Sequence, residues 1–301
     1  MSDPRVYQQA CASAREKGGG VALVPTMGAL HDGHMALVAA ARARADFVCV
    51  SIFVNPSQFG PHEDLARYPR AMEADDARCE AAGVALVFSP TREDMYPEGA
   101  ETRLVVGETA GPLCGASRPG HFDGVATIVS KLLVLTGSCV AVFGRKDYQQ
   151  WRVINRLVAD LFLPVQLVGV PTVREADGLA LSSRNRYLSS EARTRSLSLS
   201  RALSQAVRRF DDGERRAGIL RQEAEAMVAR EMDELDYVAL CDADTVQPIP
   251  DDAIVPSRVL LAVAARIGGT RLIDNVVLGE DGAPSQQEQD PTMASQQGAD
   301  E

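Results

Sequence analysis

Residues 25–34 read Pro25-Thr26-Met27-Gly28-Ala29-Leu30-His31-Asp32-Gly33-His34, and this stretch decides the fold. The apolar run 21–24 leads into it and the Ala-rich run 35–45 follows it, which predicts a strand, a turn and a helix. Gly28 and Gly33 allow the backbone to come close to a ligand. A turn that opens a helix presents free N–H groups and the positive end of the helix dipole, so the stretch suits a phosphate.

The two histidines of this stretch are three residues apart, so they share one face if they lie on a first helical turn. Imidazoles beside amide groups can neutralise the charge that develops when a phosphoanhydride is cleaved. Two other interpretations stay open: polar surface histidines on an ordinary turn, or zinc ligands, although no cysteine or third histidine lies nearby in the sequence. The spacing resembles the H-x-G-H signature of the nucleotidyltransferase superfamily.

Strands and helices alternate over the first 170 residues. Apolar runs predict strands at 47–53, 84–88, 140–143 and 165–170. Helical patterns cover 5–17, 70–82, the second part of 117–136, and 147–160. This alternation predicts an α/β fold, a Rossmann-like doubly wound parallel sheet. In such sheets ligands bind outside the carboxyl ends of the strands.

The pattern changes after residue 173. Two predicted helices, 191–210 and 214–232, precede three predicted strands, 237–241, 259–265 and 272–277. We therefore expect a Rossmann-like domain over 1–175 and a smaller C-terminal α+β domain over 176–279. The stretch 280–301 is rich in Gln, Glu, Asp, Gly, Pro and Ser, which predicts a disordered tail.

Composition excludes some function classes. A hydrophobic content of 46% is enough for a buried core, and a net charge of −10 argues against a nucleic-acid surface. The six cysteines are scattered without a C-x-x-C pair, as expected of buried thiols in a reducing compartment. The sequence shows no signal peptide and no apolar run long enough to span a membrane, so we expect a cytoplasmic protein.

Gly144-Arg145-Lys146-Asp147 joins a predicted strand to a predicted helix. Lysine occurs in this chain only at Lys17, Lys131 and Lys146, which favours a phosphate contact for Lys146 over a solvated surface position. We expect Asp147 to cap the helix. Gln150 is favoured over Gln149 to face the crevice, because it lies one turn on from Lys146.

Three further groups of polar residues follow strands or precede helices. Asn55 and Gln58 suit hydroxyl and carboxylate recognition, although Asn-Pro is also a common turn signal. Ser182, Ser183 and Arg184 suit a phosphate. Arg118 and His121 either add positive charge to the site or simply cover the sheet, and we favour the second role.

Six segments occur in one order: P-T-M-G-A-L-H-x-G-H, V-N-P-x-Q-F-G, D-L-x-R-Y-P-R, R-P-G-H-F-D-G-V-x-T, F-G-x-K-D-Y-Q-Q and G-L-A-x-S-S-R-N-R-Y-L. From residue 21 to about 188 this set resembles the pantothenate synthetase (pantoate–β-alanine ligase) family. The resemblance implies that pantoate reacts with ATP to an enzyme-bound pantoyl adenylate, which β-alanine then converts to pantothenate with release of AMP. It also implies a nucleotide- and pantoate-binding first domain, a C-terminal lid domain and a homodimer.

The resemblance assigns roles to individual residues. His34, as proton donor, would act in catalysis with His31, Lys146, Ser182, Ser183 and Arg184. ATP would contact residues 25–34, Gly144, Arg145, Lys146, Asp147, Val173, Leu181, Ser182, Ser183 and Arg184. Pantoate would contact Gln58, Gln150, Met27 and Asn55, and β-alanine would contact Gln58. Magnesium would bridge the phosphates.

The chain departs from the family pattern at three places. Arg145 stands where glutamate is usual, and we expect its side chain to point away from the site. Leu181 replaces a methionine, which is a conservative change. The family's acidic metal-binding stretch maps onto residues 73–76, where Asp75 alone matches well as a metal ligand.

Other function classes compete with this interpretation. A nucleotidyltransferase that leaves its nucleotide on the product would not need the pair of glutamines. A non-catalytic ATP-binding module would need neither Lys146 nor a second substrate pocket. The acidic chain has no anticodon-binding domain, which argues against a tRNA ligase.

Overall fold

The computed structural model describes residues 1–61 and 63–284, and the chain divides into two compact units. The first unit holds residues 1–173, 181–186 and 244–248, and the second holds 174–180, 187–243 and the chain from Ile249 onward. Within the described residues, no helix is both long enough and apolar enough to cross a membrane.

A parallel sheet of five strands forms the centre of the first unit, in the order β3-β2-β1-β4-β5. The strands are β1 (Val21–Thr26), β2 (Phe47–Ile52), β3 (Leu86–Phe88), β4 (Cys139–Gly144) and β5 (Val165–Val170). The helices are α1 (Pro4–Glu16), α2 (Asp32–Arg42), α3 (Met72–Ala81), α4 (Arg92–Met95), α5 (Cys114–Ser117), α6 (His121–Thr136) and α7 (Tyr148–Asp160). The predicted fold class is confirmed, and the predicted strands lie within a few residues of the observed ones.

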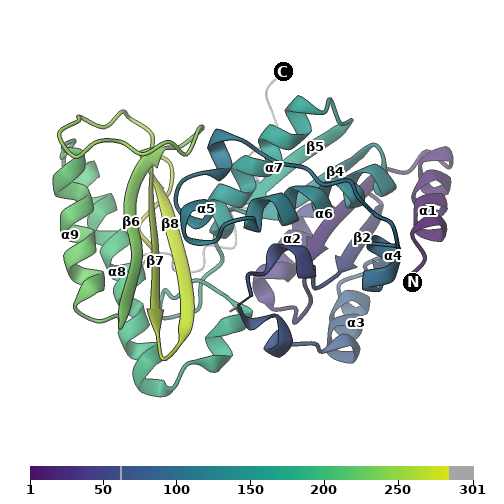
Figure 1. Ribbon diagram of the computed structural model, residues 1–301, viewed down its shortest axis with the longest axis horizontal. Coiled ribbons are helices and arrows are strands. Elements are labelled where there is room, and N and C mark those ends of the chain that lie inside the picture. The colour runs from purple at the N-terminus through teal and green to yellow at the C-terminus, as the bar shows by residue number, and fades with distance from the viewer. Residues whose placement is uncertain (62, 285–301) are drawn as a thin grey trace. The chain divides into compact units, whose positions relative to one another are not determined.

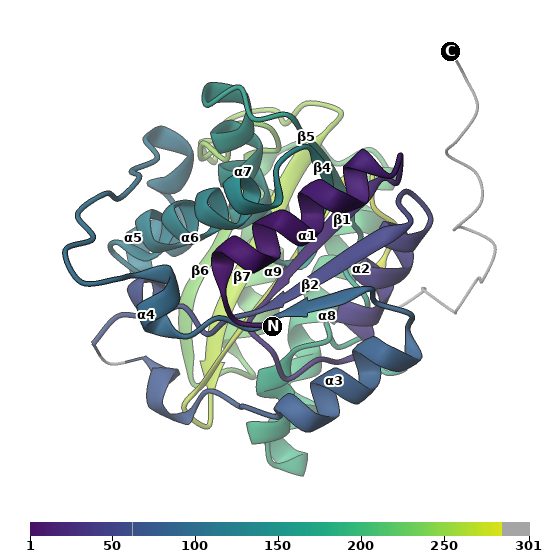
Figure 2. The same cartoon turned by 90° about the vertical axis from the view of Figure 1, so that its right-hand side faces the viewer.

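Burial explains why these strands are continuous apolar runs. Helices α1, α6 and α7 cover one face of the sheet, and α2 and α3 lie on the other (Figures 1 and 2). In β1, residues 21–24 are at most 3% exposed, so both faces of the strand are buried.

The strand order places the site of the first unit. The chain builds the sheet outward from β1 through β2 to β3, and then returns to β4 on the other side of β1. The carboxyl ends of β1 and β4 therefore meet where the direction of winding reverses, which is where α/β sheets bind their ligands.

The second unit packs two helices, α8 (Ser190–Asp211) and α9 (Ala217–Ala229), on an antiparallel sheet. Its strands are β6 (Glu234–Asp242), β7 (Val259–Ile267) and β8 (Thr270–Leu278). A buried ion pair joins Arg174 to Asp274 at 2.7 Å, with side chains 5% and 2% exposed. The two helices and the antiparallel sheet agree with the predicted α+β character of this unit.

Two boundaries differ from the sequence prediction. Residues 181–186 belong to the first unit by their contacts, whereas a boundary after residue 175 places them in the second. The predicted disorder does not begin at residue 280, because Ala283 is 5% exposed in the C-terminal core and Asp281 accepts the N–H of Val277. Residues 285–301 of the predicted tail lie outside the described residues.

Candidate active site

The turn between β1 and α2 has an unusual backbone. Gly28 and Ala29 are both left-handed, with φ of 81° and 52°. The N–H of Gly28 donates to Oγ1 of Thr26 at 3.2 Å, and those of Ala29 and Leu30 donate to Asp75 at 2.8 and 2.7 Å. The N–H groups of residues 28–30 are therefore used inside the protein. The amides suited to a ligand are those of Asp32 and Gly33, which begin α2 and have no acceptor within the helix.

His34 carries its proton on the nitrogen that a ligand can reach. Its Nδ1 accepts the backbone N–H of His31 at 3.2 Å, so the neutral ring is protonated at Nε2. Burial, the neighbouring His31 and the Lys146 ammonium lower the pKa of His34 to about 3. At neutral pH His34 is therefore an uncharged hydrogen-bond donor.

His31 lies directly beside it, with the two ring centroids 4.1 Å apart. Burial and the Lys146 ammonium lower the pKa of His31 to about 4, and Arg78 and Arg186 act in the same direction. Its Nδ1 is buried and has no hydrogen-bond partner in the described residues. Neutral imidazoles among cationic side chains suit a polyanionic ligand. Arg186 carries no signal in the sequence that sets it apart as a site residue.

Lys146 follows β4, the strand beside β1, and is half-buried. Its effect on both histidine pKa values places its charge at the same site. Asp147 stands at the N-cap of α7, as predicted, but its side chain makes no capping hydrogen bond. The residue also ends a 3₁₀ turn (Arg145–Asp147) that runs straight into the helix. A Cβ added to Gly169 would lie 3.2 Å from Cγ of Arg145, so the stem of Arg145 runs beside β5.

The loop after β2 brings Gln58 to the turn after β1. Nε2 of Gln58 donates to Sδ of Met27 at 3.2 Å, and the side chain is buried. Asn55 is 1% exposed and donates to Oε1 of Gln58 at 3.0 Å and to the carbonyl of Gly124 at 3.1 Å. Its Oδ1 accepts the Tyr96 hydroxyl at 2.8 Å. The geometry therefore contradicts a pantoate contact for Asn55, whose polar atoms are used to position Gln58.

A chain of hydrogen bonds holds the backbone of Gln58. Nδ1–H of His121 donates to the Gln58 carbonyl at 2.8 Å, and Nη1 of Arg118 donates to Nε2 of His121 at 2.9 Å. Arg118 in turn donates from Nε to Glu63 at 2.7 Å. Burial and the Arg118 guanidinium lower the pKa of His121 to about 4, which agrees with this neutral tautomer. Arg118 and His121 therefore hold the loop after β2, which differs from the expected role of covering the sheet.

The two glutamines of α7 have different surroundings. Gln149 is 5% exposed, donates to the carbonyl of Pro112 at 2.6 Å and accepts the N–H of Cys114 at 3.0 Å. It therefore fixes the segment before α6. Gln150 is half-buried, and its contact with the crevice stays a prediction.

Ser182, Ser183 and Arg184 lie in the first unit, beside the turn between β1 and α2 and the His31–His34 segment that follows it (together the H-x-G-H turn). A Cβ added to Gly33 would lie 3.7 Å from Cβ of Leu181, whose N–H donates to the Val173 carbonyl at 3.0 Å. The Arg184 guanidinium donates two hydrogen bonds of 2.9 Å to Asp64. Burial raises the pKa of Asp64, but the hydrogen bonds and charge of this guanidinium outweigh it, so the pKa lies below its ordinary value.

Tyr68 supports the same segment. Its hydroxyl lies 3.4 Å from Oγ of Ser183, and the Arg184 guanidinium lies 5.8 Å from its ring centroid. Asp64 and Tyr68 were visible in the sequence as parts of D-L-x-R-Y-P-R, but nothing in that motif indicates which residues they contact.

The prediction of Asp75 as a metal ligand does not agree with its surroundings. The side chain is 2% exposed, and both carboxylate oxygens accept backbone N–H groups. Within the described ranges, no group of three or more His, Cys, Asp or Glu side chains could hold a metal ion.

A family model for pantoate–β-alanine ligase matches residues 1–277. The chain belongs to the pantoate–β-alanine ligase family. A pantothenate synthetase from Moorella thermoacetica is 53% identical over 268 residues, which cover 89% of this chain and 94% of that protein. The relative from Myxococcus xanthus is also 53% identical, over 89% of this chain and 92% of its own length.

Solved structures show the same fold. The pantothenate synthetase from Thermus thermophilus superposes with a TM-score of 0.86 at 46% identity, over 92% of this chain and 98% of that one. The ligase from Francisella tularensis, complexed with β-γ ATP and β-alanine, has a TM-score of 0.74 at 33% identity, over 95% and 98%. This chain is therefore an ATP-using ligase of pantothenate biosynthesis that joins pantoate to β-alanine.

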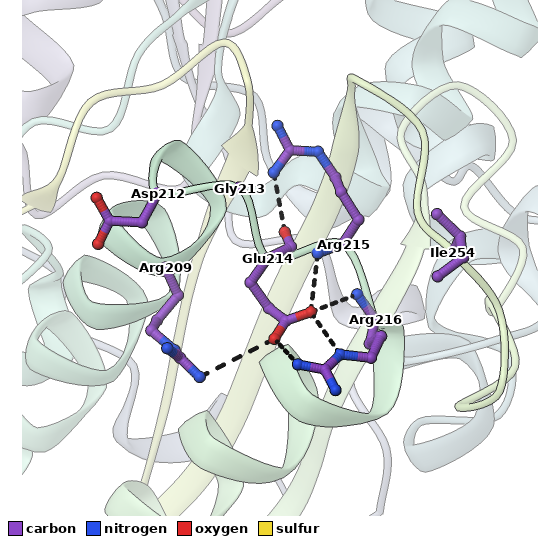
Figure 3. Close-up of a pocket in the computed structure, with 7 residues that line it drawn as sticks. All are labelled: Arg209, Asp212, Gly213, Glu214, Arg215, Arg216 and Ile254. Carbon is purple, nitrogen blue, oxygen red and sulfur yellow. Dashed lines mark hydrogen bonds and ion pairs between the residues drawn. The ribbon is translucent and has the colours of Figure 1, made fainter.

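The C-terminal unit of the ligase has a pocket of its own, of about 450 Å³ (Figure 3). Its lining residues are Arg209, Asp212, Gly213, Glu214, Arg215, Arg216 and Ile254. Glu214 pairs with Arg216 at 2.6 Å, and hydrogen bonds from Arg216 lower the pKa of Glu214 to about 2. Arg209 pairs with Glu223 at 2.9 Å, and Arg215 stacks on Phe210 at 3.7 Å. These contacts fasten the turn between α8 and α9.

Proposed function

We propose that the ligase works in two steps through a pantoyl adenylate. The pantoate carboxylate attacks the α-phosphorus of ATP and pyrophosphate leaves. The β-alanine amine then attacks the adenylate carbonyl, the bond to the phosphate oxygen breaks, and AMP leaves. A carboxylate is a poor acyl donor until its oxygen belongs to a good leaving group, so the enzyme needs to hold both reactants and stabilise charge.

The observation that carries this proposal is the neutral histidine pair beside Lys146. The Nε2–H of His34, the first amides of α2 and the Lys146 ammonium are the donors suited to the phosphates. His34 would act as a hydrogen-bond donor to the developing charge, because a pKa of about 3 leaves almost no imidazolium to act as an acid at neutral pH. His31, with its unpartnered buried Nδ1, lies next to this position.

Pantoate would lie between Gln58, Gln150 and Met27. The glutamine amides offer donors and acceptors without charge, which suits hydroxyl and carboxylate groups. The contact of Gln58 with Met27 supports this, because Met27 also belongs to the phosphate-binding turn. The bound β-alanine of the Francisella ligase supports a second acceptor site, which we assign to the side of Gln58.

Val173 and Leu181 to Arg184 would complete the nucleotide site, together with residues 25–34 and 144–147. The closeness of Leu181 to Gly33 supports this assignment. Magnesium bound with ATP would shield phosphate charge, and we assign it no protein ligand. The homodimer, the lid role of the C-terminal domain and the cytoplasmic location rest on the sequence interpretation and stay predictions.

Positional isotope exchange tests the two-step order. With ATP and saturating pantoate but no β-alanine, we expect an oxygen label to move from the α,β-bridge of ATP into non-bridging positions. No exchange under these conditions would overturn the adenylate step. An adenylated end product, in place of AMP formed only with both pantoate and β-alanine, would favour a nucleotidyltransferase. ATP binding without any turnover would favour a non-catalytic module.

A further inference from the structure

Asp75 is a buried carboxylate with no cationic partner among the hydrogen bonds it makes. It lies in the first part of α3, where the neighbouring Glu73 and Asp76 are exposed and Asp75 is 2% exposed. Its Oδ2 accepts the N–H of Ala29 at 2.8 Å, and its Oδ1 accepts the N–H of Leu30 at 2.7 Å. A carboxylate is kept at such a depth only when hydrogen bonds replace the water it has lost.

The turn whose N–H groups donate these bonds is shaped around an anion. Successive left-handed residues, Gly28 and Ala29, turn consecutive N–H groups toward one point. Backbone concavities of this kind bind anions. Here the protein supplies the anion itself, and the fit is close, because a Cβ added to Gly28 would lie 3.0 Å from Oδ2 of Asp75.

We propose that Asp75 is a positioning residue that holds the H-x-G-H turn and is not a metal ligand. Leu30 directly precedes His31, the N-cap of α2, so the two bonds of Asp75 fix where the helix begins. They thereby fix the directions of the His31 and His34 rings. The effect on catalysis rests on the proposed roles of these histidines, whereas the effect on the turn does not.

Asp75→Asn tests the inference, because it keeps the shape of the side chain and replaces one acceptor oxygen by a donor NH₂ group. One of the two backbone N–H groups then faces a donor. Asp76→Asn is the matched control, since it makes the same change one residue further on at an exposed position of the same helix.

The first readout is structural. In ¹⁵N spectra of the ligand-free protein, we expect the amide signals of Ala29 and Leu30 to move in Asp75→Asn and to stay in place in Asp76→Asn. In the wild-type protein, addition of Mg²⁺ without nucleotide should leave both signals where they are. Signals that shift with Mg²⁺ in the wild type would overturn the inference, and this measurement needs no variant to fold.

The second readout is kinetic. Because misplacement of a catalytic group by about 1 Å can cost roughly 10²-fold in rate, we expect kcat of Asp75→Asn to fall by about tenfold or more. The Mg²⁺ concentration for half-maximal rate should stay within about twofold of the wild type. A metal ligand predicts the opposite pattern, a large rise in that Mg²⁺ concentration with unmoved amide signals. Wild-type kinetics and spectra in Asp75→Asn would also refute the positioning role. If adenylate formation itself fails in the wild type, the amide signals still decide the role of Asp75.

Discussion

Replacement of Lys146 by alanine should cost the ligase most of its adenylate-forming activity while the fold survives. Lys146 is half-buried at the end of β4 and lies close enough to both histidines to depress their pKa values. A phosphate beside these rings is therefore within reach of its charge. Loss of one donor aimed at developing charge typically costs about 2.7–4 kcal/mol, or roughly 10²–10³ in rate.

The rate of adenylate formation in a single turnover is the right measurement, because it isolates the first chemical step. Lys17→Ala is the control: it removes the same charge from an exposed position at the end of α1, and its rate should equal that of the wild type. Histidine titration by NMR supplies an independent readout. Without the ammonium, the pKa of both histidines should rise from about 4 for His31 and about 3 for His34, and burial should still keep them below 6.5.

Lys146→Arg separates charge from shape. An ammonium is a compact charge on a flexible stem, whereas a guanidinium is planar and fixed in its fork. We expect the arginine variant to keep the low histidine pKa values and to fail to restore the wild-type rate. A wild-type single-turnover rate in Lys146→Arg would show that charge alone matters. A wild-type rate in Lys146→Ala would refute the role of Lys146 altogether.

Two further predictions concern the proposed pantoate contacts and the support of the loop that carries Gln58. Gln58→Ala and Gln150→Ala should each raise KM for pantoate by roughly 2- to 13-fold and leave KM for ATP unchanged. This rise is the equivalent of one neutral hydrogen bond of about 0.5–1.5 kcal/mol. An unchanged KM for pantoate in both variants would show that pantoate lies elsewhere. His121→Asn should flatten the pH dependence of the free energy of unfolding. The pKa of His121 is about 4 in the folded protein, against 6.5 for an ordinary histidine, so the native protein binds fewer protons than the unfolded chain. The native protein therefore loses stability as the pH falls below 6.5. Urea unfolding at pH 7 and pH 4.5 should show that the variant loses less stability than the wild type over this interval. One such histidine contributes up to about 1.4 kcal/mol per pH unit. An identical loss in both proteins would contradict a buried neutral His121.

The sheet could be predicted from the sequence because both of its faces are covered. A strand such as β1 or β2 must then be apolar throughout, and such runs stand out in any sequence. The H-x-G-H turn could be located for a related reason, because glycine positions and the change from strand to helix pattern are local signals. Lys146 was found because lysine is rare in this chain.

The partners of the site residues could not be predicted in this way. Asp75 bonds to amides 45 and 46 residues earlier, and Arg184 pairs with Asp64 across 120 residues. No local periodicity encodes contacts at such separations. Asn55 was assigned to the ligand for the same reason, because its side chain looks available until Gly124 and Tyr96 are seen to occupy it.

Three segments of the proposed site are each held by a polar side chain that lies outside that segment. Asp75 holds the turn after β1, His121 holds the loop that carries Gln58, and Asp64 holds Arg184. Donors that are fixed before the substrate binds need no reorganisation when charge develops in the reaction. A change in any of these anchors should therefore lower the rate without removing a ligand contact. The family motifs around Asp64 and His121 are thus explained by support of the loops, with no need for either side chain to touch a substrate.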